Sequence, residues 1–391
     1  MSAERPDQLP PPSADALAAS DALKARIADA IAAAGGWIPF SQYMALALYS
    51  PGLGYYSGGA RKFGPGGDFI TAPELTPLFG QALANQVADL LAQCAPELIE
   101  VGAGTGLLAA DLLATLAELG VTPERYRILE LSGELRERQR ETIAARVPEL
   151  LSRVEWLDEL PEAFDGVVVA NEVLDVMPLE LVAWRDGGIF ERGVAFKDGT
   201  FAWADRPAEG TLREAAAALP VVMPSEGEYV SELCLAGRAW VAEWSRRLTR
   251  GALLLIDYGY PQREFYLPSR STGTLICYYR HRAHPDPFLW PGLSDITGFV
   301  DFTAAAEAAH DTGLDVLGYC DQASFLINCG LLERLAQRGA TDTPDYIRAA
   351  KAAQRLIAPH EMGELFKVLA LGRGIEAPLR GFLRGDRLHA L

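Results

Sequence analysis

A stretch with three glycines at alternate positions constrains the fold more than any other part of this chain. It covers residues 98–109, with the sequence LIEVGAGTGLLA. The apolar residues leading to Glu100 predict a short strand, and the leucines from Leu107 to Leu116 show helical spacing. The stretch therefore predicts a strand, a tight turn and a helix.

Glycines at these positions let a ligand approach the backbone, and the free N–H groups at the start of the helix point into the same space. The spacing is G-x-G-x-G rather than G-x-G-x-x-G, and Glu100 stands close before the first glycine. A carboxylate there repels a pyrophosphate but accepts hydrogen bonds from an amino-acid ammonium. The pattern favours S-adenosylmethionine (SAM) over a dinucleotide or a ligand-free turn. The predicted cofactor contacts in this loop are Glu100, Gly102, Ala103, Gly104, Thr105 and Gly106.

Later strands add further cofactor contacts. Glu130 ends the strand predicted at 126–131, where a carboxylate can accept both ribose hydroxyls in a doubly wound sheet. Asp158 follows a strand near 154–156, and we expect it to meet the adenine amino group. Asn171 ends the apolar strand 166–170, at the edge where α/β sheets bind ligands.

Composition and charge exclude several classes of function. The formal net charge of −17 argues against a nucleic-acid partner, because phosphate binding needs a basic surface. The five cysteines are scattered and form no C-x-x-C pair, so neither a disulfide framework nor a zinc site is expected. His281 and His284 have no third ligand nearby in the sequence, so no metal is expected. No apolar run approaches the ~20 residues of a membrane span, and the acidic start is unlike a presequence, so we expect a cytoplasmic bacterial protein.

The chain divides into four predicted parts. Residues 1–14 form a loose tail, 15–76 a helical region followed by a Gly/Pro-rich lid, and 181–230 an inserted antiparallel β-hairpin region. The α/β core takes up 77–180 and 231–391. Five lid residues are the candidates to cover the cofactor or the entering substrate: Tyr55, Tyr56, Phe69, Thr71 and Pro73.

The remaining patterns predict helices and strands by their spacing. Ser41 is a candidate N-cap for a helix that ends at Leu48. The part of the insertion after residue 203 has no regular pattern. Helices are predicted at 15–31, 41–48, 77–94, 133–145, 231–248, 301–311, 322–336 and 344–357, and strands at 252–257, 316–319 and 363–371.

Taken together, the chain resembles the MidA-type family of SAM-dependent methyltransferases from about Gly35 to Leu371. The blocks that carry the resemblance are 54–56, 67–74, 79–80, 100–106, 171–175, 257–259, 295–297 and 362–367. The resemblance implies a class I methyltransferase fold, Rossmann-like and mostly parallel with an antiparallel last strand, and SAM as methyl donor. By analogy with the mitochondrial member, a complex I assembly factor, it also implies symmetric dimethylation of a protein arginine. The partner would be an arginine-bearing protein such as a core complex I subunit, and a homodimer stays open.

Arginine sets a chemical problem, because its guanidinium stays protonated at neutral pH, with a pKa above about 12. Carboxylates that bind its fork can localise the charge and leave one nitrogen nucleophilic. Our candidates are Glu172 first, then Asp175, Asp257 and Asp295, with His281 as proton acceptor. Asp257 and Asp295 could instead cap turns. Three other functions stay open: a small-molecule methyltransferase, a SAM-binding assembly chaperone and, least favoured, an NAD-dependent oxidoreductase.

Overall fold

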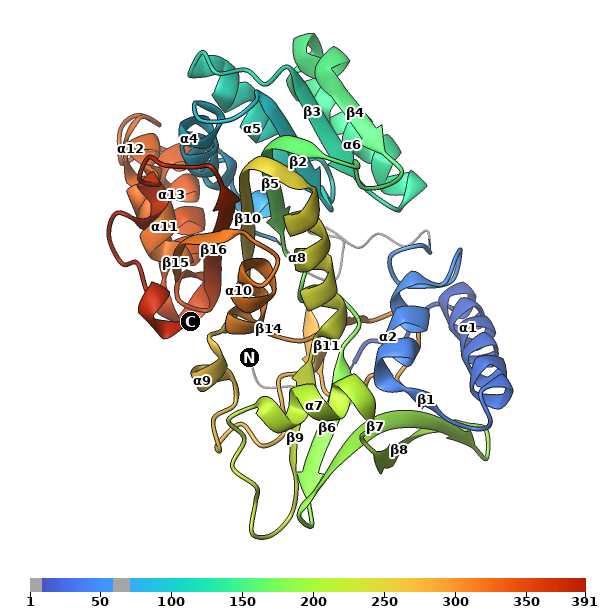
Figure 1. The fold of residues 1–391 in the computed structure, drawn as a ribbon. Helices are drawn as coiled ribbons and strands as arrows, with labels where there is room; N and C mark the ends of the chain where they lie inside the picture. The colour runs from blue at the N-terminus through green and yellow to red at the C-terminus, as the bar shows by residue number, and fades with distance from the viewer. Residues whose placement is uncertain (1–8, 59–70) are drawn as a thin grey trace. The chain divides into compact units, whose positions relative to one another are not determined.

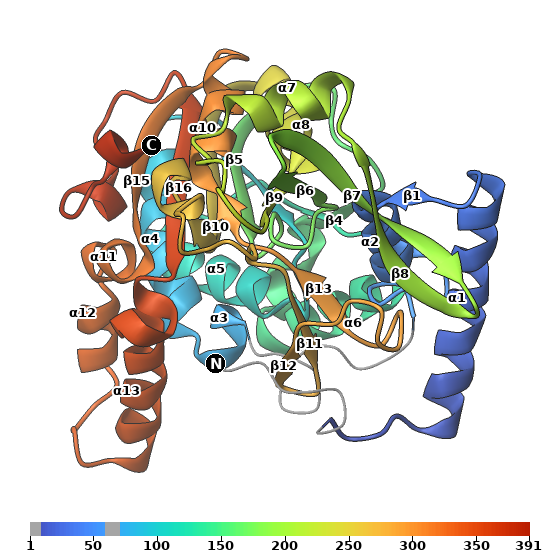
Figure 2. The same cartoon turned by 90° about the horizontal axis from the view of Figure 1, so that it is seen from below.

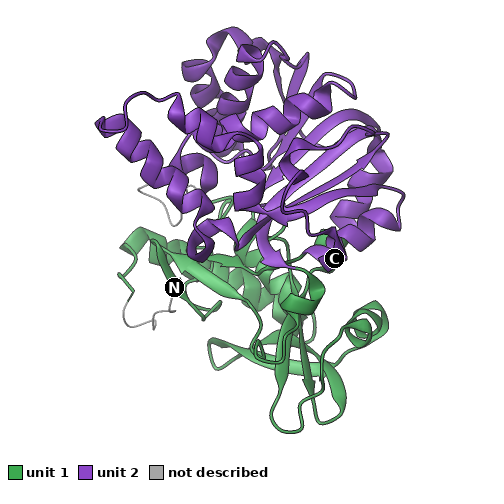
Figure 3. Ribbon diagram, turned by 90° about the vertical axis from the view of Figure 1, so that its left-hand side faces the viewer, with its two compact units in different colours: residues 1–69, 174–238, 261–301 green, residues 70–173, 239–260, 302–391 purple. Residues whose placement is uncertain are grey.

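A computed structural model describes residues 9–58 and 71–391 of the chain (Figure 1). Phe69, and the part of the predicted tail before residue 9, lie outside the described residues. The chain forms two compact units, each assembled from three segments (Figure 3). Unit 1 comprises residues 1–69, 174–238 and 261–301, and unit 2 comprises 70–173, 239–260 and 302–391.

Unit 2 is built on a mixed sheet with the strand order β15-β16-β10-β5-β2-β3-β4 (Figure 1). Neighbouring strands from β10 to β4 pair in parallel, whereas β16 pairs antiparallel with both β10 and β15. The strands are β2 (Glu97–Val101), β3 (Arg125–Leu129), β4 (Val154–Leu157), β5 (Phe164–Asn171), β10 (Leu248–Tyr260), β15 (Asp315–Asp321) and β16 (Phe366–Arg373). This is the predicted, mostly parallel sheet with an antiparallel last strand.

Helices pack on this sheet and on one another. Helix α4 contacts α5, α5 contacts α6, and α10 lies on β10, β15 and β16. Helices α11, α12 and α13 gather beside α4 (Figure 2). Their bounds are α3 (Ala72–Leu75), α4 (Leu78–Leu91), α5 (Leu107–Glu118), α6 (Gly133–Arg146), α10 (Phe302–His310), α11 (Gln322–Asn328), α12 (Leu331–Ala336) and α13 (Pro344–Ile357). Shorter helical turns lie at Pro148–Arg153, Pro359–Gly363, Arg380–Phe382 and Leu388–Ala390.

The unbroken apolar strand β5 lies at the centre of unit 2. Val167, Val168 and Val169 are completely buried, as expected for a strand covered on both faces. Leu254 in β10 and Leu98 in β2 belong to the same apolar core. The carboxyl ends of β2, β3, β5 and β10 therefore share one rigid edge, which positions the residues that follow each strand.

Unit 1 contains two antiparallel sheets. The larger has the order β1-β7-β6-β9, with β8 paired to β7, and the smaller has the order β12-β11-β13. Their strands are β1 (Ile38–Pro39), β6 (Glu180–Arg185), β7 (Gly188–Lys197), β8 (Thr200–Pro207), β9 (Tyr229–Leu233), β11 (Ile276–Tyr279), β12 (Arg282–His284) and β13 (Asp295–Thr297). The short strand β14 (Val300–Asp301) belongs to neither of these two sheets. The helices are α1 (Ala14–Ala33), α2 (Phe40–Tyr49), α7 (Gly210–Ala218) and α9 (Gln262–Phe265). Helix α8 (Leu235–Arg247) begins in the unit 1 segment 174–238 and continues in the unit 2 segment 239–260.

The two units divide the chain at other points than the prediction. Residues 71–76 of the predicted lid region join unit 2, and residues 174–180 and 231–238 of the predicted core join unit 1. Residues 261–301, also predicted to belong to the α/β core, join unit 1 as well. Apolar packing is the reason for the last difference, because Cys277 and Ile296 are buried in one core with Ile27, Met44 and Leu181.

Three local predictions were wrong. Helix α2 begins at Phe40, after Pro39, so Ser41 lies inside the helix and is not its N-cap. The helix predicted at 322–336 is interrupted at Gly330, which takes a left-handed conformation with φ 85°. Residues 210–233 contain α7 and β9, because β9 finds its partner in β6, a long-range pairing that no local pattern reveals.

No helix within residues 9–58 and 71–391 has both the length and the apolar character needed to cross a bilayer.

Candidate functional site

The glycine loop between β2 and α5 takes the conformation that its sequence predicts. Gly102, Gly104 and Gly106 have φ values of 66°, 51° and 81°, a region that favours glycine over every other residue. The Gly102 N–H donates to the carbonyl of Leu129 at 3.0 Å, which ties the loop to the end of β3. A Cβ on Gly106 would lie 2.9 Å from Cα of Gln139. Gly106 is therefore required by the close approach of α6, a reason that the sequence did not suggest.

Glu100 lies at the end of β2 and is only 2% exposed. Its Oε2 accepts a hydrogen bond from the Tyr126 hydroxyl at 2.5 Å. Burial raises the pKa of Glu100 to about 7, the Tyr126 hydrogen bond works against that rise, and the negative charge of Glu130 adds to it. The two predicted cofactor carboxylates are thus close enough to influence each other.

Glu130 directly follows β3 and is 8% exposed. Its Oε1 accepts from the Ser132 N–H at 2.9 Å and its Oε2 from Nε2 of Gln139 at 3.1 Å. Burial raises the pKa of Glu130, and these hydrogen bonds oppose the rise. The Leu131 N–H is a third donor to this carboxylate, which has four lone pairs and can therefore still accept a hydroxyl.

Leu131 is a residue that the sequence analysis missed. It follows Glu130, and its side chain is 82% exposed. An exposed apolar side chain beside the carboxylate that is predicted to bind the ribose is a suitable surface for an adenine ring. The signal was present in the sequence as a leucine directly after the acidic end of the strand.

Asp158 follows β4 with its side chain 88% exposed. Its Oδ1 pairs with Nη1 of Arg136 at 2.7 Å, and Arg136 also donates to the carbonyls of Glu130 and Leu157. Arg136 thereby fixes the chain ends after β3 and β4 to each other. The contact of Asp158 with adenine stays a prediction.

The end of the predicted lid is fastened to the glycine loop. The Thr105 hydroxyl donates to Oε1 of Glu74 at 2.6 Å, and the Glu74 N–H donates to the carbonyl of Thr71 at 3.0 Å. Pro73 lies in the first turn of α3. Sequence reasoning missed Glu74 as a structural partner of the loop, although it stands in one of the blocks that carry the family resemblance. Ala103 is buried, at 6% exposure, between the glycines.

Glu172 stands in an unusual backbone conformation at the end of β5. Its φ is 54°, which is uncommon for a residue other than glycine. The Glu172 N–H donates to the Ile256 carbonyl at 2.8 Å, and its Oε1 accepts from Nδ2 of Asn171 at 3.0 Å. Such strain is often retained at sites where a side chain must be aimed.

Asp257 holds the turn that presents Glu172. It is 1% exposed in β10, its Oδ2 accepts from the Val173 N–H at 3.2 Å, and its Oδ1 accepts from the Tyr258 N–H at 2.9 Å. The alternative that Asp257 makes turn hydrogen bonds is therefore observed, and its contact with a substrate stays a prediction. Lys367 stands directly opposite Asp257 in the pairing of β10 with β16 and is buried.

In unit 1, Tyr56 is hydrogen-bonded to Asp295. The Tyr56 hydroxyl lies 3.1 Å from both carboxylate oxygens of Asp295, which is 2% exposed in β13. The Tyr56 ring stacks on Tyr49, with centroids 5.7 Å apart, and meets the edge of the buried Tyr55 at 5.0 Å. Two of the described lid candidates are thus parts of an aromatic cluster.

Asp175 belongs to the same cluster and is 4% exposed. Its backbone carbonyl accepts from the Gly298 N–H at 3.0 Å, close to the end of β13. Burial raises the pKa of Tyr56 well above 10, and the negative charges of Asp295 and Asp175 add to that rise. Burial is also the largest cause of a raised pKa of Tyr278, and the negative charges of Asp175 and Asp295 raise it further. Two buried carboxylates therefore lie close enough to Tyr56 and Tyr278 to raise the pKa of both.

His281 lies in the turn between β11 and β12 and is exposed. It and Arg280 have φ values of 62° and 47°, as expected for a two-residue hairpin turn. Its predicted part in proton transfer stays a prediction. No group of three or more His, Cys, Asp or Glu residues in the described parts of the chain is arranged to hold a metal ion.

The predicted site residues fall into both units. The cofactor candidates and Glu172 lie in unit 2, while Tyr55, Tyr56, Asp175, His281 and Asp295 lie in unit 1. The chain passes from one unit to the other between Val173 and Leu174.

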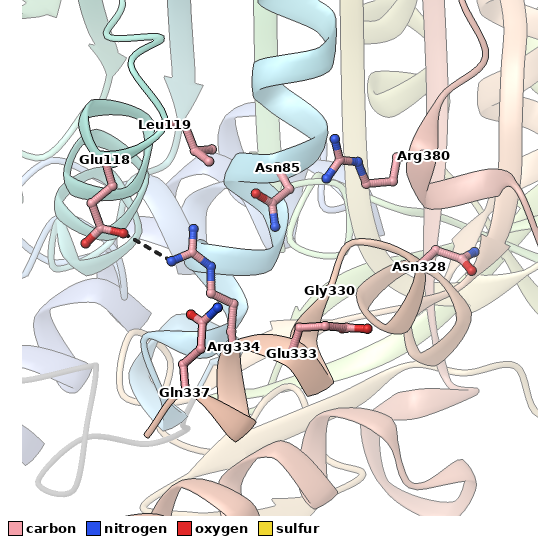
Figure 4. Close-up of a pocket in the computed structure, with 9 residues that line it drawn as sticks. All are labelled: Asn85, Glu118, Leu119, Asn328, Gly330, Glu333, Arg334, Gln337 and Arg380. Carbon is pink, nitrogen blue, oxygen red and sulfur yellow. Dashed lines mark hydrogen bonds and ion pairs between the residues drawn. The ribbon is translucent and has the colours of Figure 1, made fainter. Parts of the chain in front are cut away.

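A pocket of about 550 Å³ in unit 2 involves none of these residues (Figure 4). Its charged side chains pair with others, Arg334 with Glu118 at 3.1 Å and Arg380 with Asp89 at 2.7 Å. Its lining consists of Asn85, Glu118, Leu119, Asn328, Gly330, Glu333, Arg334, Gln337 and Arg380.

The chain is similar in sequence to known methyltransferases. A sequence profile for S-adenosyl-L-methionine-dependent methyltransferases matches residues 82–320. Mouse mitochondrial protein arginine methyltransferase NDUFAF7 is 30% identical over 381 residues, which cover 86% of this chain and 81% of that protein. The Drosophila melanogaster homologue is 27% identical over 406 residues, covering 96% and 90% of the two chains.

A crystal structure from Burkholderia thailandensis is similar over almost the whole chain. It is described as a "likely methyl transferase" bound to S-adenosyl-homocysteine. It is 52% identical, with a TM-score of 0.94, and the match covers 98% of this chain and 100% of that one. A mostly parallel sheet with a left-handed glycine loop at its carboxyl edge defines the class, a class I SAM-dependent methyltransferase. Within this class, the chain belongs to the MidA-type family.

The residues present fit SAM as the cofactor. The glycine loop and α5 would receive its amino-acid end, with Glu100 as acceptor for the ammonium, and Glu130 and Leu131 would hold the nucleoside end.

Proposed function

We propose that this chain transfers methyl groups from SAM to an arginine side chain of another protein. The observation that carries the proposal is the pair of buried carboxylates, Asp175 and Asp295, beside the Tyr56 ring and hydroxyl. Carboxylates flanked by aromatic rings suit a planar cation, which can pair with the acids and stack on the rings. The names of the mouse and fly relatives support the same substrate class.

The chemistry asks the chain to orient a cation, to withdraw a proton and to exclude water. Bound SAM supplies an electrophilic methyl group on its sulfonium sulfur. Glu172, held in its strained turn by Asp257 and Ile256, would bind two guanidinium N–H groups and localise the positive charge on their nitrogens. The remaining nitrogen would become the nucleophile, and His281 is the proposed proton acceptor.

The finer proposal follows the family resemblance of the sequence. The product would be symmetric dimethylarginine, and the partner would be a core subunit of a complex I-type respiratory enzyme or another arginine-bearing protein. Asp175 and Asp295 would contribute to holding the acceptor.

The test is a labelling experiment with the Glu172→Gln variant. Purified protein and methyl-labelled SAM are added to an extract of cells that lack this protein, and labelled proteins are hydrolysed to identify the modified amino acid. We expect labelled symmetric dimethylarginine with the wild type and at least about a 100-fold loss with Glu172→Gln, because an amide cannot localise the charge. Calorimetry should show S-adenosyl-homocysteine affinity within about twofold of wild type.

The matched control is Glu155→Gln, an exposed glutamate of β4 that should retain full transfer. Label found only in small molecules would contradict a protein substrate, and no label at all would favour an assembly chaperone. Full activity of Glu172→Gln would remove Glu172 from the proposed role.

A further inference from the structure

Gln139 is a completely buried residue of α6 whose side-chain amide makes three hydrogen bonds. Its Nε2 donates to the Gly104 carbonyl at 3.0 Å and to Oε2 of Glu130 at 3.1 Å. Its Oε1 accepts from Nε1 of Trp156 at 2.9 Å. An indole N–H is only a donor, so it can face only the amide oxygen, and this fixes the orientation of the whole group.

These three hydrogen bonds join three separate parts of the cofactor edge. Gly104 belongs to the loop after β2, Glu130 follows β3, and Trp156 lies in β4. The backbone of Gln139 also blocks any side chain on Gly106, since a Cβ there would lie 2.9 Å from its Cα. Helix α6 is thus locked onto the loop by both its backbone and this one side chain.

The same amide sets the orientation of the Glu130 carboxylate. One oxygen receives the Ser132 N–H and the other receives Nε2 of Gln139, so the plane of the group is held at both ends. A carboxylate fixed in this way presents its remaining lone pair to a ribose hydroxyl in a fixed direction. If Nε2 of Gln139 were lost, Oε2 would lose its donor and the Gly104 carbonyl would lose its link to the nucleoside end.

We propose that Gln139 is a positioning residue that sets the spacing between the nucleoside end and the amino-acid end of the SAM site. It acts through Glu130 and Gly104 rather than through its own contact with the cofactor. The inference rests on the proposed placement of Glu130 at the ribose.

The first test compares Gln139→Met with a matched control, Gln322→Met. Gln322 is also a completely buried glutamine of unit 2, and its Nε2 donates to the Leu356 carbonyl at 2.9 Å. Both variants lose a buried amide, and Gln139→Met should lower the melting temperature more, because it breaks three hydrogen bonds rather than one. S-adenosyl-homocysteine affinity, measured by calorimetry, should fall about tenfold in Gln139→Met and stay within about twofold of wild type in Gln322→Met.

A second measurement separates positioning from general destabilisation. Gln139→Glu would place a new carboxyl 3.1 Å from Oε2 of Glu130, where two negative charges are unfavourable. Protonation of the new group would restore a donor to Glu130. The ratio of the Gln139→Glu affinity for S-adenosyl-homocysteine to the wild-type affinity at the same pH should therefore rise as pH falls from about 8 to about 6.

A double-mutant cycle with Glu130→Gln completes the experiment. Because Gln139 acts partly through Glu130, the loss caused by Gln139→Met should shrink to about threefold when Glu130 is already replaced. Full additivity, or an unchanged affinity of folded Gln139→Met, would overturn the proposal. An unchanged affinity of Glu130→Gln alone would overturn the ribose placement on which it rests. None of these three results affects the arginine proposal, which the labelling experiment decides.

Discussion

The two clusters of buried acids in this molecule are encoded in different ways. In unit 2, Glu100 lies near the end of β2 and Glu130 directly follows its parallel neighbour β3, and their partners Tyr126 and Gln139 come from the same short part of the chain. In unit 1, the cluster around Tyr56 joins residues from three distant segments, with Asp175 and Asp295 as its acids. A site for a common cofactor can be contained in one βαβ unit, whereas the proposed acceptor site depends on how the insertions fold.

We expect the largest change in cofactor affinity from a substitution in the glycine loop of unit 2. Gly104 has φ 51°, where a β-branched residue is strained. Gly104→Val should weaken S-adenosyl-homocysteine binding at least about 100-fold in calorimetry, because strain and bulk both displace the loop. Gly120→Val is the matched control, since Gly120 has φ 72° in the same unit with open space around it. Unchanged affinity of Gly104→Val would refute the cofactor assignment of this loop.

A change in the cluster around Tyr56 should weaken binding of the methyl-accepting protein and leave cofactor binding unchanged. Tyr56→Phe keeps the ring but removes the hydroxyl that donates to Asp295. We expect about a thirtyfold rise in the KM for the methyl-accepting protein, because a hydrogen bond to a buried charge is lost. S-adenosyl-homocysteine affinity should change by less than about twofold.

The control for Tyr56 is Tyr43→Phe. Tyr43 is a buried tyrosine of unit 1 whose hydroxyl donates to the Pro287 carbonyl at 2.8 Å. This variant should keep the wild-type KM. If Tyr56→Phe weakened cofactor binding and left the KM unchanged, the functional distinction between the two clusters would fail.

A pH titration sharpens the comparison at Glu100. Burial raises the pKa of this folded-state carboxyl to about 7 from its ordinary value of 4.5. Its contribution to stability is therefore complete below about pH 4.5 and is lost as pH rises to about 7, by on the order of 3 kcal/mol. Urea unfolding at pH 5 and pH 7.5 should show this fall in wild type and a smaller one in Glu100→Gln.

Cofactor affinity should move in the other direction over the same range. An ionised Glu100 accepts the ammonium, so the affinity for S-adenosyl-homocysteine should rise about tenfold between pH 6 and pH 8. A pH-independent affinity in wild type would show that Glu100 does not hold the ammonium.

The smallest effect is expected at Asp158. Its side chain is 88% exposed and pairs with Arg136, and such pairs contribute about 1 kcal/mol or less. Asp158→Ala should weaken S-adenosyl-homocysteine binding by about threefold in calorimetry. A loss above about 30-fold would mean that this exposed acid contributes as much to the cofactor site as the buried ones.

The success of sequence reasoning follows the same division. The strand, turn and helix around Gly104 were predictable because short-range spacing determines them, and the completely buried β5 was recognisable as an unbroken apolar run. The assembly of unit 1 was not, because β9 pairs with β6 and the 261–301 stretch joins the apolar core of the N-terminal helices only in the folded chain.

The roles of single side chains were hardest to predict. Nothing in the sequence around Gln139 distinguishes it from the charged and polar residues of α6, although it is the member whose amide joins three elements. Asp257 looked like an acid at a strand end, and only the fold shows its two oxygens bound to backbone N–H groups. Positioning residues act through distant partners, so their signal is spatial rather than local.

The antiparallel strand β16 has a consequence for how the protein is made. It pairs with β10 along its whole length and also with β15, yet it is translated after all the other strands of that sheet. A nascent chain on the ribosome therefore exposes an unpaired apolar edge of β10 until residues 366–373 emerge. Folding of the methyltransferase sheet should thus finish only after β16 has emerged, and chaperone binding to ribosome-bound fragments would be strongest just before that point.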